Sequence, residues 1–306
     1  MLDDLKYVNE NSEYVHINMD KLKDFASNLD NLNYVHWTNE MNLGLSEKEM
    51  ILLVFIIESM NFCFWELPKW KISYKDEVYT GSNALFYTII KQVENNKEFL
   101  KIDNLLNIDK VSFNKIFEGE GICPLLEERY NCFKEVISYF SNNNVYDELF
   151  SFKTDLELMN YVITNFKYFD DKSMYKDRLI HFNKRATLLL NDLYYVSPTI
   201  RNNIGNVNNL GGCADYGIPR TFRDYGILEY NEELRNTIDN EIEIPHDSNM
   251  EIEIRANMLY VIELLRIDLK EKGIIINSVE LDYLIWWMGK ESKDRSKSHH
   301  TRTIYY

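Results

Sequence analysis

The sequence predicts a mainly α-helical fold with one small β element, formed by a single domain that spans residues 1–306. Apolar residues recur at helical spacing along most of the chain. The stretch from Met50 to Ile57 has no polar break, and a helix that is apolar on all sides has to be buried. No linker or low-complexity tract divides the 306 residues, 45% of which are hydrophobic, so we expect one sizeable core.

The first well-marked helix is expected to begin after Ser46. Ser46 and Glu49 have the spacing of a capping box, in which the serine accepts from the third helical N–H and the glutamate reaches back to the cap. Because the apolar run follows directly, this helix should lie at the centre of the molecule. It leads into residues 61–65, Asn-Phe-Cys-Phe-Trp.

A short hairpin and a series of helices are expected after this point. Residues 69–81, KWKISYKDEVYTG, partly alternate and carry a charged turn at 75–77, which is typical of a hairpin. Periodicity and breaker residues then predict helices at 83–93, after Pro124, at 155–166, at 176–196, from 221, from 232, at 251–269 and at 281–288. The glycine-containing segment 197–219 is expected to form loops.

The formal net charge of -15 restricts the partners that the protein can bind. Binding to nucleic acid depends on Lys and Arg that neutralise phosphates, so we expect no direct contact with duplex DNA or whole tRNA. A small anion in a locally basic pocket is still allowed. Residues 290–302 are such a region, because five Lys or Arg stand there against two acids.

The remaining composition points to a cytoplasmic protein without a cofactor. The four cysteines form no C-x-x-C pair, and a chain of this length does not need disulfides. The first residues are acidic and polar, unlike a signal peptide, and no apolar run is long enough to span a membrane. The six histidines show no metal-ligand spacing and there is no phosphate loop, so we expect neither metal nor cofactor.

Four stretches resemble one family, the queuosine salvage proteins that act as queuosine 5'-phosphate N-glycosylases. They are Asn61–Trp65 followed by Lys69–Trp70 and Tyr79–Gly81, then His181–Ala186, Ala214–Pro219 and His299–Tyr306. Weaker similarities occur at His36–Trp37, Pro124–Arg129 and Glu253–Ala256. The resemblance covers nearly the whole chain in a consistent order. The chain departs from the expected pattern at Cys123 and at Gly217, where we expect a basic residue.

The resemblance implies a mostly helical fold related to helix-hairpin-helix DNA glycosylases. It also implies an enzyme that hydrolyses the N-glycosidic bond of queuosine 5'-monophosphate and releases queuine for salvage into tRNA modification. Two alternatives are a nucleic-acid base glycosylase and a non-catalytic protein that binds queuine or queuosine. The net charge and the absence of a long basic face argue against the first alternative.

The chemistry of this reaction indicates which residues could be catalytic. Breaking a ribosyl N-glycosidic bond builds positive charge on the sugar, and a nearby carboxylate stabilises it and can deprotonate water. Asp215 follows two glycines in an irregular segment, where backbone can approach a ligand closely. Such an aspartate is more often a cap for loop N–H groups, and the resemblance reverses that preference. It also implies that Lys184, within a predicted helix, meets Asp215.

Substrate-binding residues are expected at both ends of the chain. Phe62 and Trp65 could stack on a flat deazapurine, although core packing is the commoner role of such residues, and the resemblance adds His36 and Tyr216. His299, His300 and Arg302 could bind a phosphate, since arginine holds phosphate oxygens bidentately. Most chain ends are solvated tails, but the ending Ile-Tyr-Tyr argues that this one is buried.

Overall fold

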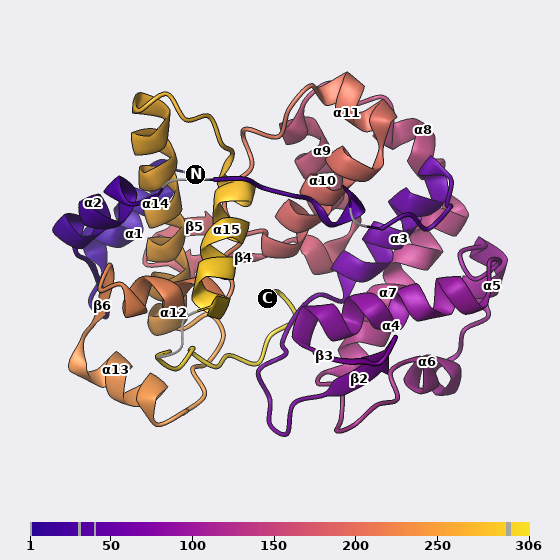
Figure 1. Ribbon diagram of the computed structural model, residues 1–306, viewed down its shortest axis with the longest axis horizontal. Coiled ribbons are helices and arrows are strands. Elements are labelled where there is room, and N and C mark those ends of the chain that lie inside the picture. The colour runs from indigo at the N-terminus through magenta and orange to yellow at the C-terminus, as the bar shows by residue number, and fades with distance from the viewer. Residues whose placement is uncertain (1, 30–31, 40, 292–294) are drawn as a thin grey trace.

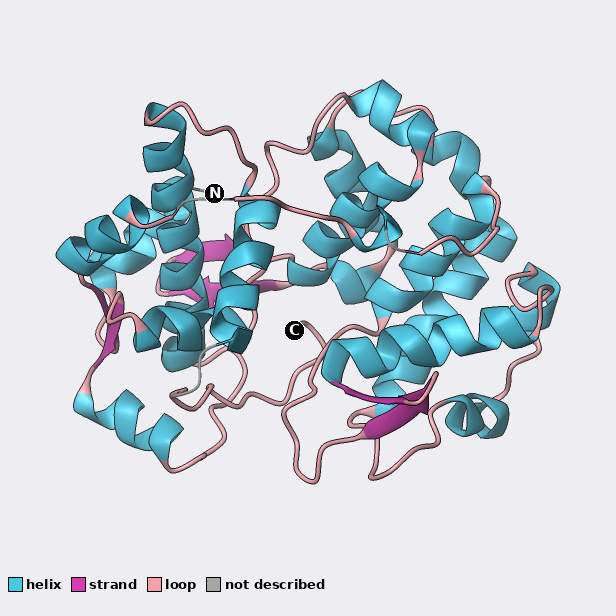
Figure 2. Ribbon diagram, in the orientation of Figure 1, coloured by secondary structure: helices cyan, strands magenta, loops and turns pink. Residues whose placement is uncertain are grey.

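The computed structural model describes residues 2–29, 32–39, 41–291 and 295–306. Helices dominate these residues, and six short strands form three two-stranded antiparallel sheets, β1–β6, β2–β3 and β4–β5 (Figure 2). The mainly helical fold class is therefore confirmed, while the expectation of one β element was too low. Every helix within these residues is too short or too polar to cross a lipid bilayer.

One group of helices packs around α3 (Glu47–Ser59), which is buried from Ile51 to Ser59 (Figure 1). Ser46 and Glu49 form the expected capping box, and α3 contacts α10, α7 and α4. The helices of this group after α3 are α4 (Gly81–Asn95), α5 (Ile102–Leu106), α6 (Lys110–Ile116), α7 (Leu126–Asn142), α8 (Val145–Leu149), α9 (Asp155–Asn165), α10 (Lys184–Val196) and α11 (Pro198–Ile204). The expected hairpin is present as β2 (Lys71–Tyr74) and β3 (Glu77–Thr80).

A second group packs around α14 (Asn249–Glu271), the longest helix. Its other elements are α1 (Leu2–Asn11), β1 (Val15–Ile17), α2 (Met19–Ser27), β4 (Lys172–Tyr175), β5 (Arg178–His181), α12 (Gly217–Asp224), β6 (Leu228–Tyr230), α13 (Glu232–Asp239) and α15 (Ser278–Glu291). The two groups have separate clusters of buried residues. In Figure 1 the C-terminus lies between them. The interpretation of residues 1–306 as one domain stays a prediction.

The prediction of a helix at 176–196 is wrong for residues 176–183. Strands β4 and β5 form a second hairpin there, with Tyr175 paired to Arg178 across a turn that contains Lys176 in a left-handed conformation. Asn183 also has a positive φ of 49°, so α10 begins only at Lys184. Lys184 is therefore the first residue of a helix and does not lie in its interior. The letters Tyr-Lys-Asp mark the turns of both hairpins, a signal that the helical periodicity obscured.

The segment 197–219 is also more regular than expected. Ser197 caps α11, and Pro198 occupies the first turn of that helix, where the missing N–H costs nothing. Helix α12 begins at Gly217, earlier than the expected residue 221. The irregular backbone is thereby confined to residues 205–216, immediately before and including Asp215.

Arginines are the largest fully buried side chains, and they hold irregular backbone in place. Arg129 on α7 donates to the carbonyl oxygens of Met60, Phe62 and Cys63, the last at 3.2 Å. Arg185 on α10 donates to the carbonyl of Ser59. Carbonyls buried away from water need donors, so these two side chains fix the segment that follows α3.

A third buried arginine, Arg255 on α14, joins four parts of the chain. Its guanidinium forms ion pairs with Asp171 at 2.6 Å and Glu251 at 3.3 Å, and its Nε donates to the carbonyl of Ala214 at 3.1 Å. The guanidinium also lies 4.0 Å from the ring centroid of Phe182 and 4.1 Å from that of Tyr306. The residue before Asp215 and the last residue of the chain thus meet at one buried charge.

Replacing Arg255 by methionine is expected to lower the free energy of unfolding by about 3–5 kcal/mol, because it leaves buried carboxylates without their partner. Chemical denaturation followed by circular dichroism measures this change. Lys6→Met removes an exposed ion pair with Glu10, 3.7 Å long, and should cause no measurable loss. Equal stability of the Arg255 variant and the wild type would show that the buried network contributes nothing.

Candidate active site

Asp215 lies half-buried at the entrance to α12. One carboxylate oxygen accepts hydrogen bonds from the backbone N–H groups of Gly217, at 2.8 Å, and Ile218, at 3.2 Å. The first turn of a helix favours negative charge, because its N–H groups have no partner inside the helix. Asp215 is thus held by a capping interaction, and its second oxygen makes no hydrogen bond to any of the described residues. A fixed carboxylate of this kind can face a cationic ligand.

Lys184 lies in a buried cluster with acids from two other helices. Its Nζ donates to the carbonyl of Asn61 at 3.1 Å. Glu58 on α3 and Asp282 on α15 are both buried, which raises their pKa values. The positive charge of Lys184 partly opposes this rise in both acids. No direct ion pair joins Lys184 to Asp215 among the described residues. The two share Asp282 as a neighbour, because the charge of Asp215 acts on this acid as well.

Burial favours the protonated forms of Asp282 and Glu58. Burial, and next the negative charge of Asp215, raises the pKa of Asp282 well above its ordinary value, although the backbone N–H of Cys213 donates to it at 2.9 Å. Burial, followed by the charge of Asp192, raises the pKa of Glu58 to about 8. Burial therefore favours the neutral form of both acids, close to the carboxylate of Asp215.

His36 is buried, and protein groups occupy both of its ring nitrogens. Nε2 lies 2.8 Å from the carboxylate of Asp192, and Nδ1 lies 2.7 Å from the hydroxyl of Thr38. The ring stacks on Tyr195 with centroids 4.3 Å apart. His36 is connected to the buried acids because Asp192 acts on Glu58, and the structure describes no contact between His36 and Asp215.

The aromatic residues expected to stack on a ligand have different surroundings. Phe62 is fully buried beneath the guanidinium groups of Arg129 and Arg185, at 4.4 Å and 4.9 Å, which favours a packing role. Trp65 is only partly buried and stacks on His300, with centroids 4.4 Å apart. Burial and the negative charge of Asp215 raise the pKa of Tyr216. The side chains of Trp65 and Tyr216 are each partly exposed, whereas that of Phe62 is buried.

The C-terminal tail folds back against the segment that follows α3, as its aromatic ending predicts. The backbone N–H of Cys63 donates to the carbonyl of Tyr306 at 2.8 Å, and the indole N–H of Trp65 donates to the carbonyl of Thr301 at 3.0 Å. Tyr306 is buried, with 2% of its surface exposed. The tail is therefore part of the folded structure and is not a solvated end.

The charged groups of the tail are less available to an anion than the sequence suggested. His299 is buried, and burial lowers its pKa to about 3, so it carries no charge at neutral pH. Burial also lowers the pKa of His300. Arg302 forms an ion pair with Glu66. Phosphate binding by these three residues stays a prediction, and their surroundings do not favour it.

Sequence reasoning did not identify Glu58, Asp282 or Arg220, and it included Lys290 only as the first residue of the basic stretch 290–302. Asp282 stands within the apolar stretch Leu-Asp-Tyr-Leu-Ile-Trp-Trp-Met, and Glu58 ends the apolar run of α3. An acid inside such a stretch is a signal for a buried carboxyl group. Lys290 and Arg220 lie in basic surroundings, but their approach to Asp215 is a matter of helix packing, which residue spacing does not reveal.

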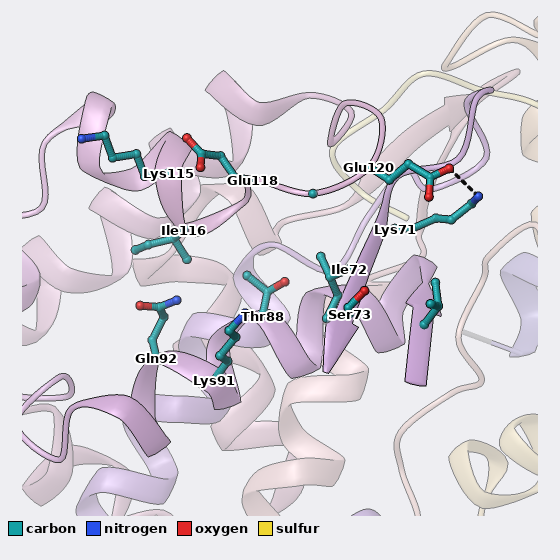
Figure 3. A pocket seen from close by; sticks show the side chains of 12 residues that line it. Lys71, Ile72, Ser73, Thr88, Lys91, Gln92, Lys115, Ile116, Glu118 and Glu120 are labelled. Atoms are coloured by element: carbon teal, nitrogen blue, oxygen red, sulfur yellow. Dashed lines mark hydrogen bonds and ion pairs between the residues drawn. The ribbon is translucent and has the colours of Figure 1, made fainter. Parts of the chain in front are cut away.

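Two other features lie apart from the Asp215 cluster. His246, Asp247 and Glu251 have potential metal-ligand atoms within 4.8 Å of one another, the one such group among the described residues. Glu251 already pairs with Arg255. A cavity of about 350 Å³ lies beside the β2–β3 hairpin, where Lys71 pairs with Glu120 (Figure 3). Its lining residues include none of Asp215, Lys184, Glu58 and Asp282.

Comparison with known proteins agrees with this arrangement of motifs. The queuosine salvage protein family matches residues 41–306. A relative from Sphaerobacter thermophilus, named queuosine 5'-phosphate N-glycosylase/hydrolase, is 30% identical over 278 residues, covering 88% of this chain and 85% of the relative. Relatives of the same name from Dictyostelium discoideum and Mus musculus are each 26% identical, covering 89% and 88% of this chain and 84% and 85% of the relatives.

Asp282→Asn tests whether this buried acid is protonated. Because its pKa is raised in the folded state, the wild type binds one proton more than its unfolded chain and loses stability as the pH rises above the ordinary value of an aspartate. The asparagine variant lacks this loss. From about pH 4 up to the raised pKa of Asp282, the free energy of unfolding of the variant should increase relative to wild type by up to about 1.4 kcal/mol per pH unit. Denaturant titrations at several pH values measure the difference, and parallel curves would mean an ionised Asp282.

Proposed function

Because this chain belongs to the queuosine salvage protein family, we propose that it hydrolyses the N-glycosidic bond of queuosine 5'-monophosphate and releases queuine for salvage into tRNA modification. The relatives that match it along most of its length are N-glycosylase/hydrolases of that nucleotide. The observation that carries the proposal is the carboxylate of Asp215, which the first turn of helix α12 holds close to the buried acid Asp282.

In the proposed reaction Asp215 stabilises the positive charge that develops on the ribose. Two backbone N–H groups hold one of its oxygens, which leaves the other free to face the sugar or to accept a proton from the attacking water. Electrostatic stabilisation of this kind depends on a group that is fixed before the reaction starts. The capping interaction supplies that fixation, so the capping and catalytic interpretations of Asp215 are compatible.

Asp282, whose neutral form burial favours, is suited to assist the departure of the base. A departing base gains electron density, and a protonated carboxyl group can donate a hydrogen bond to it. Lys184 is held at 3.1 Å from the carbonyl of Asn61, near both Asp282 and Glu58. Its charge stabilises the ionised form of either acid. We assign Lys184 to positioning and charge balance, since hydrolysis by water needs no covalent lysine.

Trp65 and Tyr216 are the proposed stacking surfaces for the base, because they are only partly buried. His300 stacks on one face of Trp65, so a base would stack on the other face. Phe62 and His36 would support the site indirectly. Phe62 packs against the guanidinium of Arg129, and His36 contacts the carboxylate of Asp192. Aromatic stacking on a base contributes about 1–3 kcal/mol, so these rings account for affinity and not for the chemical step.

We further propose a cytoplasmic protein of one domain, related in fold to helix-hairpin-helix DNA glycosylases, that acts on the free nucleotide and not on DNA or tRNA. The net charge of -15 supports the last part, because a polyanion would be repelled from most of the surface. Activity on the mononucleotide and none on an oligonucleotide that contains queuosine would distinguish this proposal from a nucleic-acid glycosylase.

Asp215→Asn is expected to lower turnover of queuosine 5'-monophosphate by roughly 10²-fold or more while substrate affinity changes little, because a neutral amide cannot stabilise the cation. Release of queuine, followed by chromatography, gives the rate, and calorimetry with the inactive variant gives the affinity. The exposed Asp103→Asn serves as the matched control.

A near wild-type rate in the Asp215 variant would remove this residue from the mechanism. Wild-type protein that binds the nucleotide but never releases queuine would be a binding protein and not an enzyme.

A further inference from the structure

Two residues of the proposed site, Lys184 and Asp215, belong to different groups of helices. Lys184 is the first residue of α10, in the group around α3, whereas Asp215 stands shortly before α12, in the group around α14 (Figure 1). Within the described ranges of the chain, no hydrogen bond joins Lys184 to Asp215. Their relative position therefore depends on a contact that reaches the backbone of both.

Arg255 on α14 reaches the segment before Asp215 directly. Its Nε donates to the carbonyl oxygen of Ala214 at 3.1 Å, and this carbonyl belongs to the peptide unit between Ala214 and Asp215. Because a peptide unit is planar, a donor that fixes the carbonyl also fixes the N–H of Asp215. That N–H donates to the carbonyl of Cys213 at 2.7 Å. Arg255 therefore sets the direction in which the backbone enters Asp215.

The same side chain reaches the segment before Lys184 through Asp171. The guanidinium of Arg255 donates to both carboxylate oxygens of Asp171, at 2.6 Å and 3.2 Å. The backbone carbonyl of Asp171 accepts from the N–H groups of Phe182, at 2.9 Å, and Asn183, at 3.2 Å. The ring centroid of Phe182 also lies 4.0 Å from the guanidinium. The two residues that precede Lys184 are thus held against Arg255.

Arg255 can hold both segments because its own side chain is fixed. It is fully buried, and Glu251, four residues earlier on the same face of α14, lies 3.3 Å from its Nη1. Burial opposes the ionisation of Glu251, but the hydrogen bond from His246 and the charge of Arg255 lower its pKa to about 2. The carboxylate of Glu251 is therefore ionised. Since the guanidinium is planar and its donors point in set directions, it cannot turn toward one partner without leaving another.

We propose that Arg255 is a positioning residue that sets Lys184 and Asp215 relative to one another. The inference rests on the proposed function. Arg255 is buried beneath both segments, so it acts through their backbone and not on the substrate. Electrostatic stabilisation requires groups that are fixed before the reaction starts, and a misplacement of about 1 Å can lower a rate by about 100-fold.

Arg255→Lys tests the inference, because lysine keeps the positive charge that the buried carboxylates need but lacks the planar set of donors. It should lower kcat for queuosine 5'-monophosphate by about 10-fold and change KM much less, since the groups that bind the substrate are unaltered. Arg266→Lys is the matched control, because Arg266 also lies on α14 and pairs with a glutamate, Glu263, at 2.9 Å. The control should change neither value.

A double-mutant cycle shows whether Arg255 acts through Asp215. In the Asp215→Asn background, Arg255→Lys should lower kcat much less than in the wild-type background, because the group that Arg255 positions is already disabled. An equal loss in both backgrounds would mean a general weakening of the structure and would overturn the inference, as would a wild-type kcat in the single variant. If Arg255→Lys does not fold, Glu251→Gln weakens the same side chain's hold and should give the same pattern.

Hydrogen exchange separates this inference from the proposed function. Arg255→Lys should speed the exchange of the backbone N–H groups of residues 217–218, which the carboxylate of Asp215 holds, and of residues 182–183. Such a change in a protein that does not hydrolyse the nucleotide would refute the proposed function and leave the coupling of the two segments standing. Unchanged exchange at these residues, in a protein that does release queuine, would refute the positioning role alone.

Discussion

The buried charge of Arg255 is the constraint on which the rest of the structure depends. A guanidinium removed from water is stable only if carboxylates and acceptors surround it, and here Asp171, Glu251 and the carbonyl of Ala214 meet that need. Asp171 immediately precedes β4, Glu251 belongs to α14 and Ala214 immediately precedes Asp215. Satisfying one charge therefore fixes the backbone that carries the candidate catalytic carboxylate and the ring of Tyr306 that closes the core.

The candidate site brings charges of both signs close to one carboxylate. Burial favours the neutral forms of Asp282 and Glu58, which lie with Lys184 in the interior. Arg220 and Lys290 are only partly buried. The charge of Asp215 acts on Asp282 and on both of these cations.

Local signals in the sequence were enough to predict part of the fold. The capping box at Ser46, the central position of α3 and the first hairpin all followed from spacing. The stretch at 176–183 was misread because its residues fit a helical period as well as a strand, and only tertiary packing decides between them. Asp282 and Lys290 approach Asp215 through the packing of α15 against α12. Likewise, nothing near Arg302 in the sequence shows that Glu66 is its partner.

The pairing of the first residues with the second core has a consequence for how the chain folds. Helix α1 packs on α14, and β1 pairs with β6, whose residues follow about two hundred positions later. The buried residues of the core around α3 lie between 51 and 213, with the addition of Val279, and partly buried residues from Trp37 onward pack against them. During synthesis that core can form almost completely before α14 is made. Until then α1 and α2 have no helix to pack against, and their apolar faces stay exposed. Contacts of such long sequence separation form slowly, so the nascent N-terminal segment is where chaperones would be needed.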